Sequence, residues 1–320
     1  MKMGSVKDLM IEKKPTETET GIGVFKFTDD YSVFDYGKMP DTIPMKGEAL
    51  CRMAAYNFQE LEKIGIKSHF KKLVSGNEMQ VNIVRVLFPQ KGELEEGMNN
   101  YLVPLEVIFR NSLPEGSSVF KRVKKGETTF EKLGLDKEPA PGEKLTKPIM
   151  DVSTKLEPTD RYLTWEEAQE ISRLTKEEME ELKEKALRIN GFLSKRAEEI
   201  GLEHADGKVE FAMNPKRELV LVDVCGTLDE NRFLHNGVHV SKQVLRDYYK
   251  TTPWYEVIEK EKAEGKGHGE FTVPPSLPRE LIEITANMYK SVCETWTGEK
   301  TFNAPSIEET MNTYREFLEK

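Results

Sequence analysis

The stretch "DGKVEFAMNPKRELVLVDVCGTLDENRF", Asp206 to Phe233, decides the fold of this chain. Its first part, Gly207 to Met213, alternates apolar and charged residues, as a half-buried strand does. The residues "NPKR" then form a turn, and the apolar run "ELVLVDV" follows as a second strand. The stretch therefore predicts a β-hairpin that carries acidic and basic side chains on one face.

The pairing of the two strands determines which side chains meet. A turn at "NPKR" predicts that Met213 pairs with Glu218. Lys208 then lies opposite Asp223, with Glu210 as their diagonal neighbour, although a slip of one residue would separate the groups. Two such acids suit Mg²⁺, which takes oxygen ligands and keeps waters or phosphates in its other positions. An exposed cross-strand salt bridge, which contributes little to stability, explains the spacing equally well.

The end of the hairpin, "DVCGTL", is also similar to the "DxDGT" motif of haloacid-dehalogenase-type phosphatases, in which the first Asp is the nucleophile. Here Asp223 takes that place, but Cys225 replaces the second, acid/base Asp. A phosphatase domain of this type also needs several βα units after the nucleophile. The residues after Asp229 are largely helical in pattern and broken by prolines, so we do not expect a phosphatase.

Length, charge and cysteine content limit the classes of function. The chain has 320 residues, enough for about two domains. Its net charge is −9 with both signs interleaved, which argues against a nucleic-acid partner. Three widely spaced cysteines give neither a disulfide framework nor a zinc pattern, and no signal peptide or membrane span is evident. We therefore expect a cytoplasmic protein that acts on small molecules.

Two groups of elements are expected along the chain. Residues 21–27 and 79–88 are patterned as strands, and Leu50 to Leu61 have helical spacing that stops at Gly65. Residues 102–109 are patterned as a buried strand. A boundary just before that strand divides the chain into an N-terminal α+β domain, residues 1–100, and a larger α+β domain, residues 101–320.

The larger domain contains clear helix signals. "TWEE" at Thr164–Glu167 and "TKEE" at Thr175–Glu178 are capping boxes, and the second opens a long amphipathic helix that stops at Gly201. Residues 126–148 contain several prolines and are predicted to be a loop. The chain beyond Phe233 is predicted to be mainly helical.

Several motifs, in order, resemble those of one enzyme family. They are "GSVK" (Gly4–Lys7), "VPLEVIFRN" (Val103–Asn111), "GSSVFKR" (Gly116–Arg122), "DGKVEF" (Asp206–Phe211) and "DVCGTLDENRF" (Asp223–Phe233). Together they resemble the phosphoribosylaminoimidazole-succinocarboxamide synthase (SAICAR synthetase) family. The resemblance implies a two-domain α+β fold, in which a small antiparallel sheet domain and a larger sheet domain with flanking helices enclose an ATP cleft.

The resemblance also implies the reaction. The family joins carboxyaminoimidazole ribonucleotide to L-aspartate and cleaves ATP to ADP and phosphate in the presence of Mg²⁺. An oxide cannot leave from a carboxylate, so the carboxylate is first phosphorylated to an acyl phosphate that the aspartate amine attacks. Homo-oligomers are compatible with this function. The tail after about Lys260 lies outside the motifs.

Nucleotide and metal roles follow from the resemblance. Gly4 and Lys7 match residues near the ATP phosphates, where Ser5 replaces a family lysine, and Lys155 matches a lysine near the same phosphates. Leu102 and Val103 match the adenine slot. The catalytic centre implied by the resemblance comprises three residues: Glu210 and Asp223 match the magnesium-binding acids, and Lys208 matches the lysine beside them. Asp223 is thereby interpreted as a metal ligand rather than a nucleophile.

Substrate roles follow in the same way. Arg110, Ser118, Asp206 and Arg232 match residues that contact the ribonucleotide, and the planar fork of arginine suits phosphate or carboxylate. Two alternatives remain: an ATP-dependent phosphotransferase or amide ligase with another acceptor, and a non-catalytic nucleotide-binding paralogue. The second is suggested by Ser5 and by Val224, which stands where the family has a Glu.

Overall fold

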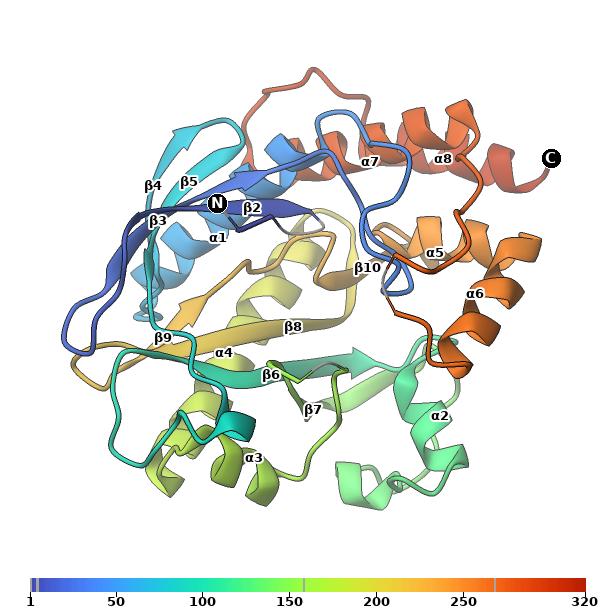
Figure 1. Ribbon diagram of the computed structural model, residues 1–320. Coiled ribbons are helices and arrows are strands. Elements are labelled where there is room, and N and C mark those ends of the chain that lie inside the picture. Colours follow the sequence, from blue (N-terminus) through green and yellow to red (C-terminus); the bar gives the residue numbers. More distant parts are fainter. Residues whose placement is uncertain (1, 4–5, 158, 268) are drawn as a thin grey trace.

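The computed structural model describes residues 2–3, 6–157, 159–267 and 269–320, and shows two antiparallel sheets flanked by helices (Figure 1). The predicted α+β class is confirmed. The smaller sheet has the strand order β1-β2-β3-β5-β4, and helix α1 packs on it. The bounds are β1 Lys2–Met3, β2 Lys7–Lys13, β3 Gly21–Phe27, α1 Lys46–Lys63, β4 Phe70–Ser75 and β5 Glu78–Ile83.

The larger sheet has the order β11-β10-β8-β6-β7, and β9 pairs with β8 off this path. Helix α4 packs against β8, β6 and β9, and covers one face of the sheet (Figure 1). The strands are β6 Tyr101–Ser112, β7 Lys144–Thr154, β8 Glu203–Met213, β9 Leu219–Val222, β10 Asn231–His235 and β11 Val238–His239.

Helix ends agree with the local signals in the sequence. Both predicted capping boxes form, with Thr164 and Thr175 as N-caps, and Gly65 follows α1 in the left-handed conformation. The helices of the larger part are α2 Ser118–Lys124, α3 Trp165–Ser172, α4 Lys176–Glu199, α5 Gln243–Lys250, α6 Pro253–Ala263, α7 Arg279–Thr297 and α8 Ile307–Leu318; two 3-10 turns span Pro89–Lys91 and Glu131–Leu133.

The core runs through both parts of the chain. Strands of the smaller sheet end at Ile83 and those of the larger sheet begin at Tyr101, but one hydrophobic cluster includes buried residues from both sides of that gap. The C-terminal helix α7 packs on α1, where the Trp296 Nε1–H donates to Asn57 Oδ1 at 2.7 Å. The division into domains 1–100 and 101–320 therefore stays a prediction, because the two parts share their interior.

The central hairpin forms, but its predicted register is wrong by one residue. Met213 pairs with Leu219 rather than Glu218, which places Glu210 opposite Val222. The turn contains one more residue than predicted because Arg217 adopts a left-handed conformation, with φ of 58°. The second strand then ends at Val222.

Three other expectations need correction. The strand predicted over 79–88 ends at Ile83, because the Arg85 N–H and guanidinium turn aside to the carbonyls of residues 99 and 100. Pro148, placed in a loop, lies within β7, which is an edge strand where proline is tolerated. The region after Phe233 is not all helical: β10 and β11 form a hairpin whose turn is Asn236–Gly237, with positive φ at both residues.

Strand β9 joins the two sheets. Leu221 accepts a hydrogen bond from the His69 N–H and donates its own N–H to the Lys67 carbonyl, both at 2.9 Å. The segment before β4 is thus attached to the far edge of the central hairpin. The residues of β9 lie at the junction between the sheets, and Asp223 follows directly after them.

Within the described residues, no helix combines the length and apolar character needed to cross a membrane.

Candidate active site

The first group of site residues lies at the junction of the sheets. Lys7, at the start of β2, forms an ion pair with Asp223 at 2.5 Å between Nζ and Oδ1. Asp223 has a φ of 66°, which ends the extended strand and changes the direction of its side chain. Burial alone would raise the pKa of this carboxyl, but three lysines, Lys7, Lys155 and Lys208, hold that pKa well below its usual range.

The second group continues from the first along β8 and β6. Glu210 accepts from Lys155 Nζ at 2.6 Å and from Lys208 Nζ at 3.0 Å. Glu106 pairs with Lys208 and lies 3.7 Å from Lys155 Nζ. Burial opposes the charge of Lys208, yet the surrounding acids raise its pKa well above the usual range. The register error therefore did not separate the groups, because the left-handed Asp223 returns to the same neighbourhood.

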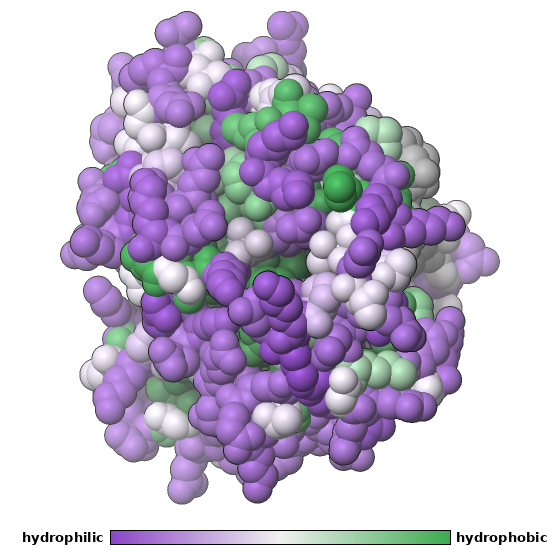
Figure 2. Space-filling view, turned by 90° about the vertical axis from the view of Figure 1, so that its left-hand side faces the viewer, coloured by the Kyte–Doolittle hydropathy of each residue, from purple (hydrophilic) through white to green (hydrophobic). Residues whose placement is uncertain are grey.

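An apolar patch lies on the same face of the sheets. Ala212, Val220 and Val222 form a buried cluster, and Leu102 and Val84 pack against it. A neighbouring cavity of about 740 Å³ is lined by Val84, Val220 and Val222. Figure 2 views the molecule from the side of β9 and shows hydrophobic surface in a hollow between hydrophilic lobes.

The side chains of the two predicted adenine-slot residues, Leu102 and Val103, lie in different places. The Leu102 side chain belongs to the apolar patch, whereas the Val103 side chain is fully buried in the main core. Successive strand residues point to opposite faces, so only one of the pair can face the cleft with its side chain. A nucleotide could therefore reach Val103 only through its backbone.

A third group gathers around Arg110. The Arg110 guanidinium donates to Ser118 Oγ and to the Tyr162 hydroxyl, each at 3.2 Å, and lies 3.4 Å from Asp151. The Ser118 and Tyr162 oxygens are 2.7 Å apart. Arg122 stacks on the Tyr162 ring and pairs with Asp151. Two arginines thus share one buried aspartate.

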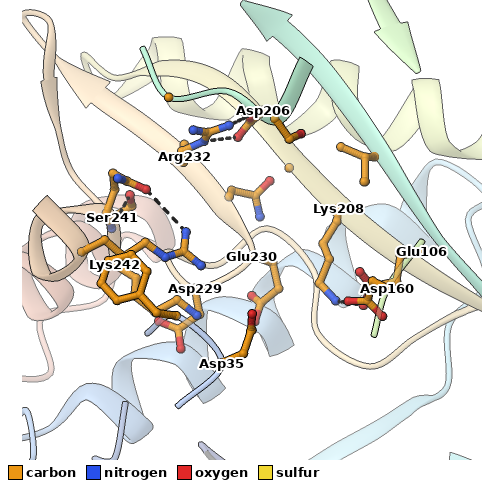
Figure 3. A pocket seen from close by; sticks show the side chains of 18 of the residues that line it. Asp35, Glu106, Asp160, Asp206, Lys208, Asp229, Glu230, Arg232, Ser241 and Lys242 are labelled. Carbon is orange, nitrogen blue, oxygen red and sulfur yellow. Dashed lines mark hydrogen bonds and ion pairs between the residues drawn. The ribbon is translucent and has the colours of Figure 1, made fainter. Parts of the chain in front are cut away.

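Arg232 and Asp206 complete that group from the adjoining strands. They form a two-pronged ion pair, with Nε donating to Oδ1 at 2.8 Å and a second bond to Oδ2. Arg110 Nη1 also lies 3.5 Å from Asp206. All four predicted ribonucleotide residues therefore meet in one network. They line a cavity of about 700 Å³ together with Lys208 (Figure 3).

Sequence reasoning missed two cations of this cavity. Lys242, just before α5, and Arg246, on α5, line its wall, and burial lowers the pKa of each. Within the described ranges, neither has an acidic partner at ion-pair distance, and the Arg246 guanidinium contacts only the Gln243 side chain at 3.4 Å. Their spacing of four residues on one turn was a weak signal that could have indicated a shared face.

A buried triad beside these cations was also missed. Lys46 is fully buried and pairs with Asp229 at 2.8 Å, and the Tyr289 hydroxyl donates to the same carboxylate at 2.6 Å. Lys46 also lies over the Tyr289 ring, 5.5 Å from its centroid. The three residues come from α1, the loop after β9 and α7, so no local pattern in the sequence could have connected them.

The acids expected to bind Mg²⁺ are Glu210 and Asp223. Gly4 and Ser5 lie outside the described residues, and among those described no group of three or more His, Cys, Asp or Glu is arranged to hold a metal. Glu210 and Asp223 supply the oxygen donors that Mg²⁺ prefers, and Lys155 and Lys208 each act electrostatically on both acids. A two-carboxylate site completed by phosphate oxygens fits this donor set.

Comparisons with known proteins agree on one family. The SAICAR synthetase family model matches residues 4–261. A protein of Archaeoglobus fulgidus is 44% identical over 99% of this chain and 100% of its own, and the phosphoribosylaminoimidazole-succinocarboxamide synthase of Thermoplasma acidophilum is 37% identical over 87% and 93%.

Solved structures show the same fold. SAICAR synthase of Saccharomyces cerevisiae complexed with SAICAR has a TM-score of 0.67 at 23% identity, covering 94% of this chain and 95% of its own. A SAICAR synthetase in complex with ADP has a TM-score of 0.64 at 21% identity, covering 93% and 98%.

Proposed function

Because the chain belongs to the SAICAR synthetase family of ATP-dependent ligases in purine biosynthesis, we propose that it joins carboxyaminoimidazole ribonucleotide to L-aspartate through an acyl phosphate. One observation carries this proposal. The lysine–carboxylate cluster around Asp223 and Glu210 lies between an apolar patch and a cavity lined by arginines. In a reaction that activates a carboxylate with ATP, these three regions would hold the adenine, the phosphates and the acceptor carboxylate, respectively.

The apolar patch is the proposed adenine position. Leu102, Val220 and Val222 offer apolar contact there for a base. The phosphates then point to Lys7 and Lys155. Their ammonium groups oppose the negative charge that develops on the transferred phosphoryl group and the leaving ADP.

Glu210 and Asp223 are the proposed Mg²⁺ ligands, as in the family. When bound, the ion would neutralise phosphate charge and orient the γ-phosphoryl group. The neighbouring Lys208 keeps its positive charge at all physiological pH values, because the adjacent acids raise its pKa. It therefore holds Glu210 through an ion pair, acts on Asp223 through its charge, and contributes a fixed charge to the phosphate region.

The ribonucleotide is proposed to occupy the cavity of Figure 3. Arg110 and Ser118 lie at one wall and Arg232 at the next, so a phosphate or carboxylate can receive several charged hydrogen bonds. Asp206 fixes the two arginines by pairing with both. Lys242 and Arg246, which form no ion pair with any described acid, are available for the carboxylates of the second substrate.

A coupled ADP-release assay tests this function. ATP, the ribonucleotide and L-aspartate are supplied, and each is omitted in turn. We expect full ADP release only with all three, and hydroxylamine should replace aspartate and yield a hydroxamate. ADP release that needs the ribonucleotide but ignores both amines would favour the phosphotransferase alternative, and none under any condition would favour the non-catalytic paralogue.

The metal site is tested by Asp223→Asn and Glu210→Gln. Each change should lower turnover by about a hundredfold or more, as loss of one electrostatic catalytic group does. The double variant should be little worse than either single one, because the two acids act as a unit. Circular dichroism verifies the fold, and near-normal turnover in either variant would contradict the proposed metal site.

A further inference from the structure

Glu230 is an acid of the proposed substrate cavity that forms no ion pair with a described cation. It lines the cavity, and its side chain accepts a hydrogen bond from the Thr227 hydroxyl. Within the described part of the chain, no Lys, Arg or His lies at ion-pair distance from it. The other half-buried or buried acids of this wall are paired: Asp206 with Arg232, Asp229 with Lys46, and Glu106 with Lys208.

The surroundings of Glu230 make it a stronger base than a surface glutamate. Burial raises its pKa, and the neighbouring charges of Asp229 and Asp223 raise it further. Lys7 and the hydrogen bond from Thr227 act in the opposite direction but do not cancel the effect. A carboxylate with a raised pKa accepts a proton from an amine more readily than an ordinary one does.

The position of Glu230 complements that of the unpaired cations. Figure 3 shows it between Lys208 and Asp229, with Asp35 pointing into the same part of the cavity. Lys242 and Arg246 line the cavity too, and neither forms an ion pair with an acid in the described part of the chain. A carboxylate and two cations that form no ion pair with described residues, all in one cavity, match a molecule that carries both an ammonium group and carboxylates.

We propose that Glu230 binds the α-ammonium group of the incoming amino acid and acts as the general base that releases its nucleophilic amine. This inference rests on the proposed ligase function and adds the residue that prepares the second substrate. Among the described residues, Asp35 and Asp160 also have no cationic partner at ion-pair distance, but both are exposed, so water screens their charge.

The ammonium group gives one proton to the Glu230 carboxylate and keeps the freed electron pair on nitrogen. That pair forms the C–N bond at the acyl carbon, while the bond from carbon to the phosphate oxygen breaks and phosphate leaves with its electrons. A second nitrogen proton goes to the departing phosphate. Glu230 then returns its proton to solvent.

Glu230→Gln tests the proposal with two acceptors in parallel. Hydroxylamine is largely unprotonated at pH 7.5 and needs no general base, whereas the aspartate amine is protonated. We expect amide formation with aspartate to fall about a hundredfold or more, the usual contribution of a general base. Hydroxamate formation should stay within about threefold of wild type. Glu256→Gln, on the exposed surface of α6, is the matched control and should behave as wild type with both acceptors.

The pH dependence gives a second readout. Raising the pH supplies unprotonated aspartate from solution, so the defect of Glu230→Gln should shrink steadily between pH 7 and pH 9. Equal losses with both acceptors, or a defect that ignores pH, would overturn the base assignment in favour of a structural role. Normal turnover with aspartate would also overturn it. A wild-type enzyme that forms neither product would instead contradict the proposed ligase function itself.

Discussion

The charges of Lys46 and Lys242 both lower the pKa of Asp229, but the two ammonium groups have different surroundings. Lys46 is fully buried and pairs with Asp229 at 2.8 Å, and the Tyr289 hydroxyl donates a hydrogen bond to the second oxygen of the same carboxylate. Lys242 lies on the cavity wall with no acidic partner at ion-pair distance in the described residues. Burial lowers its pKa, and Asp229 offsets this only in part.

The difference separates a structural charge from a ligand-binding charge. A paired buried charge holds remote segments in place, here α1, the loop after β9 and α7. An unpaired one has an unfavourable desolvation energy that an anionic ligand can relieve. Perturbed groups of the second kind cluster at functional sites. Substitution should therefore change stability at one lysine and ligand affinity at the other.

The largest expected effect is at Lys46. Lys46→Met leaves the Asp229 carboxylate buried without its cation, so we expect the free energy of unfolding to fall by about 3–5 kcal/mol. Urea denaturation measures it. Lys63→Met is the control, because Lys63 pairs with Glu60 on the exposed surface of α1 and should cost at most about 1 kcal/mol. Similar losses in both variants would show that burial does not distinguish these lysines.

The next effect concerns Lys242. Lys242→Met removes a half-buried charge that has no acidic partner at ion-pair distance among the described residues, so stability should be unchanged or higher. The apparent affinity for an anionic substrate should fall by about tenfold to a hundredfold, the equivalent of one charged hydrogen bond of about 1.5–3 kcal/mol. Steady-state kinetics with each substrate varied in turn, beside urea denaturation, measure the two quantities. A clear loss of stability with unchanged KM values would reverse the assignment.

The smallest expected effect concerns His204, a buried titratable group that stays neutral instead of being paired or left charged. His204 accepts from Ser194 at Nδ1 and donates from Nε2 to Asn231, and burial lowers its pKa to about 4. The unfolded state binds the proton first, so stability is complete above about pH 6.5 and declines as pH falls toward 4, by about 1.4 kcal/mol per pH unit.

His204→Gln removes that titration. We expect the free energy of unfolding to depend less on pH between 6.5 and 4 than in wild type, by up to one proton. Urea denaturation at several pH values gives the slope. His69 is also buried with a pKa of about 4 and remains in the variant, so part of the slope should persist. An unchanged slope would mean that His204 is protonated in the folded protein.

The sequence predicted what depends on local pattern or on a motif. Arg110, Ser118, Asp206 and Arg232 were expected together and lie together, because adjacent strands of one sheet carry three of them. The capping boxes and the end of α1 were also predictable, since each is determined within four residues.

What failed depended on conformation or distance along the chain. The register of the hairpin was wrong because nothing in "NPKR" announces a left-handed Arg217. The contact of Lys46 with Asp229 spans 183 residues, and α7 adds Tyr289 from a further 60 residues away. Pairings of that range come from the packing of the whole core, which no window of sequence contains.

The attachment of Leu221 to the His69 and Lys67 backbones restricts how the enzyme can move. A rotation that pulled the two sheets apart at β9 would have to stretch both of these hydrogen bonds. We therefore expect any opening of the cleft to be a rotation about β9, with the two sheets staying attached at this strand. In such a rotation, the residues furthest from the axis move most. Substrates should therefore enter and leave at the ends of the small sheet that lie far from β9. Asp223, which directly follows β9, should keep its position throughout the catalytic cycle.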